Sequence, residues 1–386
     1  MIKANYPIDK FKEITTPFYY YDMEVLRATL AEISCHIHEQ PFEVHYAFKA
    51  NVNPQVLKAI REAGFGADCV SGGEVQAALD AGIATDKIVF AGVGKADWEI
   101  NLGLDNDIFC FNVESLPELE VIDELAGAKK KTARVALRIN PNVSVDTHHY
   151  ITTGTNENKF GINMSELDKV IEVAQTLKNI KLIGIHFHIG SQITDMSSFQ
   201  DLCVRINELQ ELFESKGVEL ENINVGGGLG INYQHPNHFP IPEFEAYFKT
   251  FRDHLQLRKG QKLHFELGRA VVAQCGSLIS RVLYVKEGST KRFAILDAGF
   301  TELIRPALYQ AYHRIENLSS DQQEEAYDVV GPICESSDVF AKDFKMNKTQ
   351  RGDIIALRSA GAYGEIMASQ YNLRKLPKAY TSDELL

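Results

Sequence analysis

Residues 44–64 read VHYAFKANVNPQVLKAIREAG and contain the pattern that decides the fold. The first seven are mostly apolar or aromatic, with His45 and Lys49 as exceptions, which predicts a strand buried in a sheet. Pro54 then begins a helical pattern that Gly64 ends, because proline suits the first turn of a helix and glycine its end. A strand followed at once by a helix is the unit of parallel α/β folds.

This unit recurs along the chain as far as about residue 267. Short β-branched or apolar runs alternate with amphipathic helical stretches such as residues 197–217. Eight parallel strands over roughly 220 residues predict an α/β fold with a closed (β/α)₈ barrel of the TIM type. The predicted strands are 44–50, 66–70, 87–93, 107–113, 134–140, 181–189, 222–225 and 262–267.

A second domain is predicted after Arg269, where the helical rhythm stops. Apolar runs separated by glycine and polar turns then predict an antiparallel β domain. The aromatic segment TPFYYYD at 16–22 precedes the barrel and is expected to pair into the same sheet. We expect a barrel domain over residues 25–266 and a β domain made of residues 1–24 and 267–386, an alanine racemase-like arrangement.

The composition bounds the class of protein. The 386 residues carry a net charge of -12 with 45% hydrophobic residues, which argues for a soluble globular protein and against binding to nucleic acid or anionic lipid. The absence of an apolar signal segment or a spanning apolar run predicts a cytoplasmic protein that does not enter membranes. Six cysteines without CxxC spacing predict reduced thiols and no metal site.

The predicted strands end in polar residues. In a barrel enzyme, catalytic groups gather at these carboxyl ends. Each residue taken alone is better explained as a cap or a paired core group, and for Asp68 and Glu74 the structural and functional interpretations are equally weighted. Together they converge on one mouth. They are Lys49, Asp68, Arg138, Asn140, His188, Gly226, Gly227, Gly228 and Glu266.

The glycines after the seventh strand predict a phosphate site, because they let backbone N–H groups approach an anion. Gly268 and Arg269 of the next loop, with Ser191, could complete it. A phosphate site beside a lysine, a histidine and a carboxylate points to pyridoxal 5'-phosphate. Lys49 would hold its aldehyde covalently, with an amine pKa lowered by burial, and Glu266 would pair with the pyridine nitrogen.

The chain resembles the fold-type III pyridoxal-phosphate decarboxylases, and within them the diaminopimelate decarboxylases. The resemblance covers nearly the whole chain. It departs from the family pattern at Leu267 and His149, where proline is common. The motifs that carry it, in the family's order, are YAFKAN, GADCVSGGE, THHYITTGTNENKFGI, HFHIGSQI, GGGLGI, ELGRA, RPALY, GPICESSDVFAKD and AGAYG.

The resemblance implies a role for each matching residue. Lys49, His188, Glu266 and Cys334 would be catalytic: the aldehyde-binding lysine, the histidine stacked on the ring, the partner of the pyridine nitrogen and the proton donor. Cys334 and Glu335 would reach into the neighbouring subunit, so a homodimer with shared sites is implied. Further cofactor contacts would come from Asp68, Ser191, Gly226, Gly227, Gly228, Leu267, Gly268, Arg269 and Tyr363. Substrate contacts would come from Arg269, Arg305, Tyr309, Glu335 and Tyr363.

The charges of these residues favour one small amino-acid substrate. meso-Diaminopimelate presents a carboxylate and an ammonium group at its non-reacting centre, which suit Arg269 or Arg305 and Glu335. The expected reaction is decarboxylation at the D-centre to give L-lysine. The alternatives are a same-fold decarboxylase of carboxynorspermidine, ornithine or arginine, a non-catalytic pyridoxal-binding barrel, and a sugar-phosphate barrel enzyme without pyridoxal.

Overall fold

The computed structural model describes residues 6–143 and 159–385. The predicted departure at His149 and most of the motif around it lie outside these residues. Among the described residues no helix is both long and apolar enough to cross a membrane.

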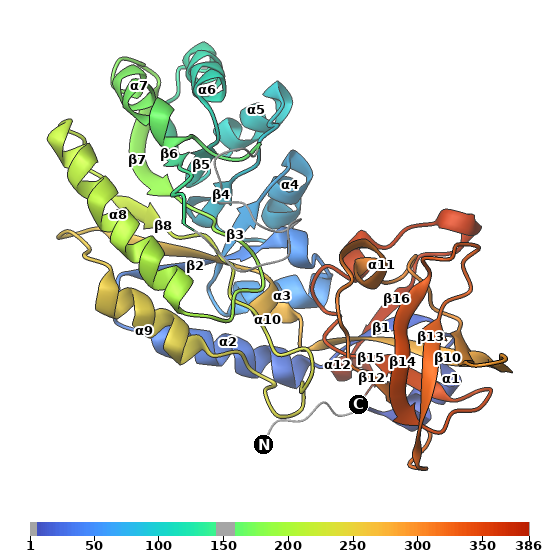
Figure 1. The fold of residues 1–386 in the computed structure, drawn as a ribbon. Coiled ribbons are helices and arrows are strands. Elements are labelled where there is room, and N and C mark those ends of the chain that lie inside the picture. The colour runs from blue at the N-terminus through green and yellow to red at the C-terminus, as the bar shows by residue number, and fades with distance from the viewer. Residues whose placement is uncertain (1–5, 144–158, 386) are drawn as a thin grey trace.

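Eight parallel strands close into a barrel, as the alternating pattern predicts, and β2 pairs with β9 to complete the ring (Figure 1). Several strands end earlier than predicted, because the residues at the mouth of the barrel belong to the loops and not to the sheet. Lys49 therefore lies on the 3₁₀ turn η1 (Phe48–Ala50) and not on the strand itself. The barrel strands are β2 (Phe42–Ala47), β3 (Gly66–Cys69), β4 (Ile88–Phe90), β5 (Cys110–Val113), β6 (Ala133–Arg138), β7 (Ile180–His186), β8 (Asn222–Asn224) and β9 (Lys262–Leu267).

Helices cover the outside of the barrel, and local capping explains where they begin. Asn53 caps α3 by accepting a hydrogen bond from the backbone of Gln55, next to Pro54 in the first turn. Ser71 caps α4 in the same way through the backbone of Glu74. The barrel helices are α2 (Met23–Ile37), α3 (Pro54–Glu62), α4 (Gly72–Asp80), α5 (Asp97–Asp105), α6 (Leu116–Ala128), α7 (Met164–Ala174), α8 (Ser197–Ser215) and α9 (Phe244–His254), with the 3₁₀ turn η2 (Thr85–Lys87).

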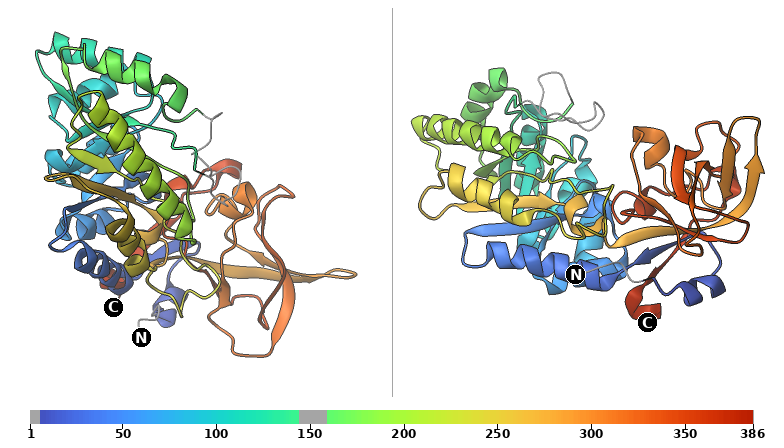
Figure 2. Two further views of the ribbon diagram at one scale, coloured as in Figure 1. Left: turned by 60° about the vertical axis from the view of Figure 1, so that its left-hand side comes forward. Right: turned by 60° about the horizontal axis from the view of Figure 1, so that its bottom comes forward.

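A separate sheet of mainly antiparallel strands lies beside the barrel (Figure 2). Its path runs β12-β15-β10-β11-β13-β14, and β1 joins it by pairing with β10, as predicted for the aromatic segment. Two pairings are parallel, β1 with β16 and β11 with β13, so the predicted antiparallel character holds for most of the sheet. The strands are β1 (Phe18–Tyr21), β10 (Gly276–Glu287), β11 (Arg292–Leu296), β12 (Ile315–Asn317), β13 (Glu324–Val330), β14 (Val339–Asn347), β15 (Ile354–Leu357) and β16 (Lys378–Thr381).

Hydrogen bonds connect the barrel to the second sheet. Asn51 links them by donating hydrogen bonds to the hydroxyl of Tyr21 and the carbonyl of Gly361. The expected domain limits at 24/25 and 266/267 fall inside α2 and β9. The remaining helices and turns are α1 (Ile8–Glu13), α10 (Arg269–Val272), α11 (Arg305–Tyr309), α12 (Ser382–Leu385), η4 (Glu365–Met367) and η5 (Tyr371–Leu373).

Candidate active site

A cavity of about 360 Å³ opens at the carboxyl ends of the barrel strands, where the second sheet meets them. Barrel residues form one wall, and residues of α11 and of the loops around Tyr363 form the other. It brings together many of the residues predicted from scattered motifs. Of these, the lining contains Lys49, His188, Ser191, Gly228, Glu266, Leu267, Gly268, Arg269, Arg305, Tyr309 and Tyr363.

Lys49 reaches the cavity beside a buried carboxylate. Its Nζ lies 3.3 Å from Asp68 Oδ2, and its side chain is 39% exposed whereas that of Asp68 is fully buried. Burial acts to lower the pKa of Lys49, but the charges of Asp68 and Glu266 raise it above its ordinary value. The expectation of a lowered pKa is therefore wrong, because the nearby acidic groups, Asp68 foremost, outweigh the effect of burial.

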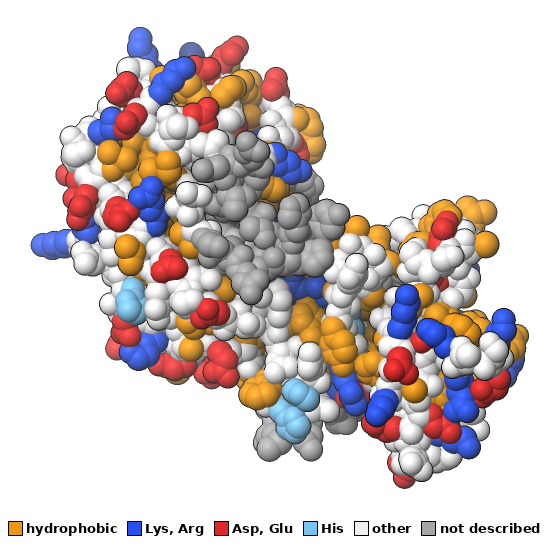
Figure 3. Space-filling view, viewed as in Figure 1, with side chains coloured by type: hydrophobic (Ala, Val, Ile, Leu, Met, Phe, Trp, Pro, Cys, Tyr) orange, Lys and Arg blue, Asp and Glu red, His pale blue; other side chains and the backbone are white. Residues whose placement is uncertain are grey.

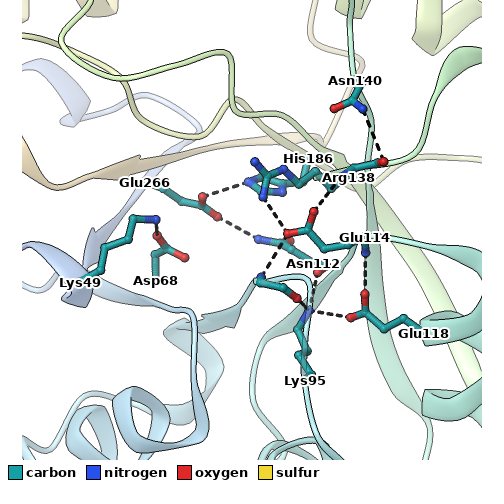
Figure 4. Close-up of polar contacts among 12 residues, drawn as sticks. Lys49, Asp68, Lys95, Asn112, Glu114, Glu118, Arg138, Asn140, His186 and Glu266 are labelled. Atoms are coloured by element: carbon teal, nitrogen blue, oxygen red, sulfur yellow. Dashed lines mark hydrogen bonds and ion pairs between the residues drawn. The ribbon is translucent and has the colours of Figure 1, made fainter. Parts of the chain in front are cut away.

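Glu266 is held by three side chains that come from β5, β7 and β8. Its Oε1 accepts a hydrogen bond from Asn112 Nδ2 at 2.9 Å, and its Oε2 lies 2.9 Å from His186 Nε2 (Figure 4). The same Oε1 also accepts from Asn224 Nδ2 at 2.7 Å. Burial acts to raise the pKa of Glu266, but His186 and Lys49 lower it below its ordinary value. The carboxylate is thus fixed in position and ionised.

The carboxyl groups of Asp68 and Glu74 have raised pKa values, in contrast to the lowered pKa of Glu266. Burial and the charge of Glu266 raise the pKa of Asp68 to about 6, although Lys49 opposes the shift. Burial raises the pKa of Glu74 to about 7, while a hydrogen bond from the backbone of Val70 opposes that shift. The site therefore holds one strongly ionised carboxylate and two that titrate near neutrality.

His188 lies against the cavity in its neutral form. Burial lowers its pKa well below the ordinary value, and the charges of Lys49 and Arg138 lower it further. A neutral imidazole in this position can pack flat against an aromatic ring without adding charge.

The glycines after β8 differ in what they contact. Gly228 lines the cavity at a φ of +107°, where a Cβ would come within 2.9 Å of the Gly190 carbonyl oxygen. Gly226 and Gly227 do not line it: a Cβ on either would overlap the carbonyl oxygen of Phe187 or Glu266. Close packing of the barrel backbone explains these two, and their predicted cofactor contacts remain a prediction.

Two arginines, Arg269 and Arg305, also line the cavity. Arg269 donates from its NH1 to the Tyr233 hydroxyl at 2.7 Å and from its NH2 to the Ser191 hydroxyl at 2.9 Å. Arg305 donates to the same Tyr233 oxygen at 3.1 Å. Burial acts to raise the pKa of Tyr233, but the two guanidinium charges lower it below its ordinary value.

A buried network supports the site from the side of β5 and β6. Arg138 NH1 pairs with Glu114 Oε1 at 2.7 Å, and Lys95 pairs with Glu118 at 2.6 Å (Figure 4). Lys95 also donates to the carbonyl of Asn112, whose side chain holds Glu266. The network thus connects the loops after β4 and β5 to the carboxylate at the cavity.

Comparison with known proteins places the chain in a family. The model described as a pyridoxal-dependent decarboxylase, pyridoxal binding domain, matches residues 26–273. The diaminopimelate decarboxylase of Bacteroides thetaiotaomicron is 66% identical over 386 residues, 100% of each chain. The chain belongs to the diaminopimelate decarboxylase family.

Other diaminopimelate decarboxylases give the same picture. The enzyme of Aquifex aeolicus is 43% identical over 330 residues, 85% of this chain and 78% of that one. The crystal structure of diaminopimelate decarboxylase from Helicobacter pylori complexed with L-lysine matches with a TM-score of 0.91 at 37% identity, over 97% of this chain and 93% of that one. The predicted family and fold are therefore confirmed.

Pyridoxal phosphate is the cofactor of this pyridoxal-binding domain, and the cavity fits it. Gly228 and Gly268 line the cavity without a Cβ, so the backbone N–H groups there can approach a phosphate. Asp68 keeps one buried oxygen, Oδ1, without a hydrogen-bond partner among the described residues, so a polar group can still be accommodated there.

Two predicted site residues of the diaminopimelate decarboxylase pattern lie elsewhere. Cys334 and Glu335 are exposed and do not line the cavity of their own chain. Glu335 Oε1 instead accepts a hydrogen bond of 2.6 Å from the hydroxyl of Tyr371.

Sequence analysis missed the residues that hold the predicted ones. Asn112 and Asn224 lie on β5 and β8, and His186 ends β7 only two residues before His188. Their signal was a polar side chain next to buried apolar residues of a strand, as in the CFNV sequence of β5. Tyr233, between the two arginines, gave no signal because it follows the glycine motif in an ordinary loop.

Proposed function

We propose that this chain decarboxylates meso-diaminopimelate at its D-centre and releases L-lysine. The observation that carries the proposal is one cavity with Lys49 and Glu266 beside two arginines. The first pair suits pyridoxal phosphate, and the arginines suit a substrate with a second carboxylate.

Lys49 and Glu266 would hold the cofactor at its two reactive ends. When bound, pyridoxal phosphate supplies an electron sink for the pair of electrons left by departing CO₂. Glu266 is ionised and fixed by three partners, so it can keep a proton on a facing ring nitrogen. Asp68 lies 3.3 Å from Lys49 Nζ and can hold a proton that leaves the amine.

The remaining predicted contacts serve orientation. His188 would pack against the ring, while Ser191, Gly228, Leu267 and Gly268 would surround the phosphate with donors and backbone. Asp68 would orient Lys49, and Tyr363 would close the cavity from the second sheet, where its ring faces the Arg269 guanidinium at 5.0 Å. Gly226 and Gly227 would keep the loop shape that this arrangement needs.

Arg269 and Arg305, with Tyr309, would bind the non-reacting centre of the substrate. A diamine-forming decarboxylase of ornithine would meet only an ammonium group there and would have no use for two arginines. This charge argument favours diaminopimelate over ornithine.

We propose that the site is completed by a second copy of the chain. Cys334 and Glu335 are exposed beside Tyr371, which stacks on Phe300 with ring centroids 5.9 Å apart. Nearby Ile366, Leu373 and Leu376 are exposed, and Figure 3 shows hydrophobic side chains gathered on this smaller lobe. In a homodimer Cys334 would return the proton and Glu335 would bind the substrate ammonium group; sedimentation at twice the chain mass is expected.

Two further assignments follow from the sequence and are proposed with it. The barrel domain would comprise residues 25–266 and the β domain residues 1–24 and 267–386. The enzyme would act in the cytoplasm, which fractionation of cells checks.

Turnover tests the proposed reaction. Purified protein with added pyridoxal phosphate should release CO₂ from meso-diaminopimelate and not at comparable rates from ornithine, arginine or carboxynorspermidine. Lys49→Ala should lose the visible absorbance of lysine-bound cofactor and at least about 10³-fold in turnover. Equal rates on all four substrates would overturn the choice of substrate, and an unchanged spectrum would overturn the role of Lys49.

A further inference from the structure

One phenol oxygen joins the two arginines of the cavity. Tyr233 lies in the loop after β8, and its oxygen accepts from NH1 of Arg269 at 2.7 Å and from NH1 of Arg305 at 3.1 Å. The guanidinium groups also lie near the ring, at 6.0 and 5.3 Å from its centroid. Two like charges are therefore held together by a neutral group.

The other partners of these arginines are also neutral. Arg269 NH2 donates to Ser191, and Arg305 NH1 donates to His313 Nε2 at 2.9 Å. His313 Nδ1 donates to the carbonyl of Arg358, which leaves its Nε2 as the acceptor. No carboxylate of the described residues lies within ion-pair distance of either arginine.

The arginines are buried and not fully satisfied. Arg269 is 7% exposed and Arg305 is 6% exposed, and Arg269 Nε has no hydrogen-bond partner in the described part of the chain. A buried cation without a counter-charge is costly, so this end of the cavity is built for an anion.

Counting hydrogens identifies a further donor. A tyrosine hydroxyl has two lone pairs and one O–H. Both lone pairs of Tyr233 accept from the arginines, and no described group accepts its O–H. The two guanidinium groups and this O–H together offer N–H and O–H donors to the two oxygens of a carboxylate.

We propose that Tyr233 is a specificity-determining residue, and that its hydroxyl, with Arg269 and Arg305, binds the carboxylate of the substrate's non-reacting centre. The inference rests on the proposed function and deepens it. The carboxylate is favoured over the cofactor phosphate because Arg305 comes from α11, on the wall opposite the glycines, and Tyr233 bonds to it directly.

Binding of two product-like ligands to the holoenzyme tests the proposal. L-Lysine keeps the carboxylate of the non-reacting centre, whereas cadaverine has the same two amines and no carboxylate. Tyr233→Phe should weaken L-lysine binding by about tenfold in calorimetry, since a hydrogen bond to a charged group is lost. Cadaverine binding should stay within about twofold, and the KM for meso-diaminopimelate should rise more than kcat falls.

Tyr247→Phe is the matched control. Its hydroxyl is buried on α9 without a hydrogen-bond partner among the described residues, so its loss should leave both ligands and the melting temperature unchanged. The proposal is overturned if Tyr233→Phe leaves L-lysine binding intact, weakens both ligands equally, or instead weakens retention of pyridoxal phosphate. Failure of the wild type to decarboxylate meso-diaminopimelate would overturn the proposed function, whereas the two ligand measurements judge Tyr233 separately.

Discussion

The charge states of Lys49 and Glu266 depend on neighbours from other strands. Burial alone acts to lower the pKa of Lys49 and to raise that of Glu266, yet both shift the other way. Each group faces an opposite charge at short range, Asp68 for the lysine and His186 for the glutamate. Interactions within the barrel interior thus decide which form each residue takes.

Glu74 allows a test of pH-dependent stability. Its pKa is raised from 4.5 to about 7, so its contribution to stability is full below about pH 4.5 and is lost as pH rises through about 7. Glu74→Gln removes this loss and can still accept the hydrogen bond from Val70. The difference in unfolding free energy between Glu74→Gln and wild type should therefore shift in favour of the variant, by on the order of 1 kcal/mol, between pH 5 and pH 8.

Melting temperatures at the two pH values measure this difference. Glu62→Gln, on the exposed face of neighbouring α3, is the control. Its change in melting temperature relative to wild type should be the same at pH 5 and at pH 8. The same offset for Glu74→Gln at pH 5 and pH 8 would contradict the assignment.

At the scale of the element, the loop after β8 shows how a tight backbone shapes the site. Gly226 has a φ of +70°, and a Cβ there would overlap the carbonyl oxygen of Phe187. Gly217, after α8, has nearly the same φ of +73° with nothing within 4 Å of a Cβ. The two positions thus share their φ and differ in packing.

Alanine at these two glycines separates strain from overlap. Gly217→Ala should cost about 1 kcal/mol of stability, the usual penalty for a side chain at positive φ. Gly226→Ala should cost more than about 3 kcal/mol, because the backbone of Phe187, just after β7, must also move. Thermal unfolding of the two variants compares these losses of stability. Equal losses would show that the backbone moves at Gly226 without an energetic penalty, which contradicts the prediction.

At the scale of the whole molecule, the barrel and the second sheet together form the cavity. The exposed segment with Cys334 and Glu335 does not line the cavity of its own chain. Lys49 lies in that cavity, while Cys334 lies outside it. If sites are shared in a dimer, an active site combines Lys49 of one copy with Cys334 of the other.

Mixing two inactive variants tests this arrangement. Random dimers of Lys49→Ala and Cys334→Ala chains should recover about a quarter of wild-type turnover, because half of the dimers are mixed and each has one intact site. Each variant alone is the control. No recovery, with dimers present, would mean that both residues act within one chain.

The alternation of strand and helix by itself determined the barrel. The spacing of apolar residues and the turn residues act over a few positions of the chain. The eight barrel strands, the sheet beyond Arg269 and the pairing of Phe18–Tyr21 could therefore be predicted from local pattern. The glycine motif and the polar strand ends likewise indicated the mouth of the barrel, since parallel strands all end on the same side.

Only the tertiary structure decided how the predicted residues are held and charged. Asn112, His186 and Asn224 meet Glu266 from three other barrel strands, and Tyr233 meets Arg305 from 72 positions away in the chain. Hydrogen bonds and ionisation depend on distances of a few ångströms and on the loss of water. Neither quantity exists until distant segments are packed together, so local sequence pattern could not contain them.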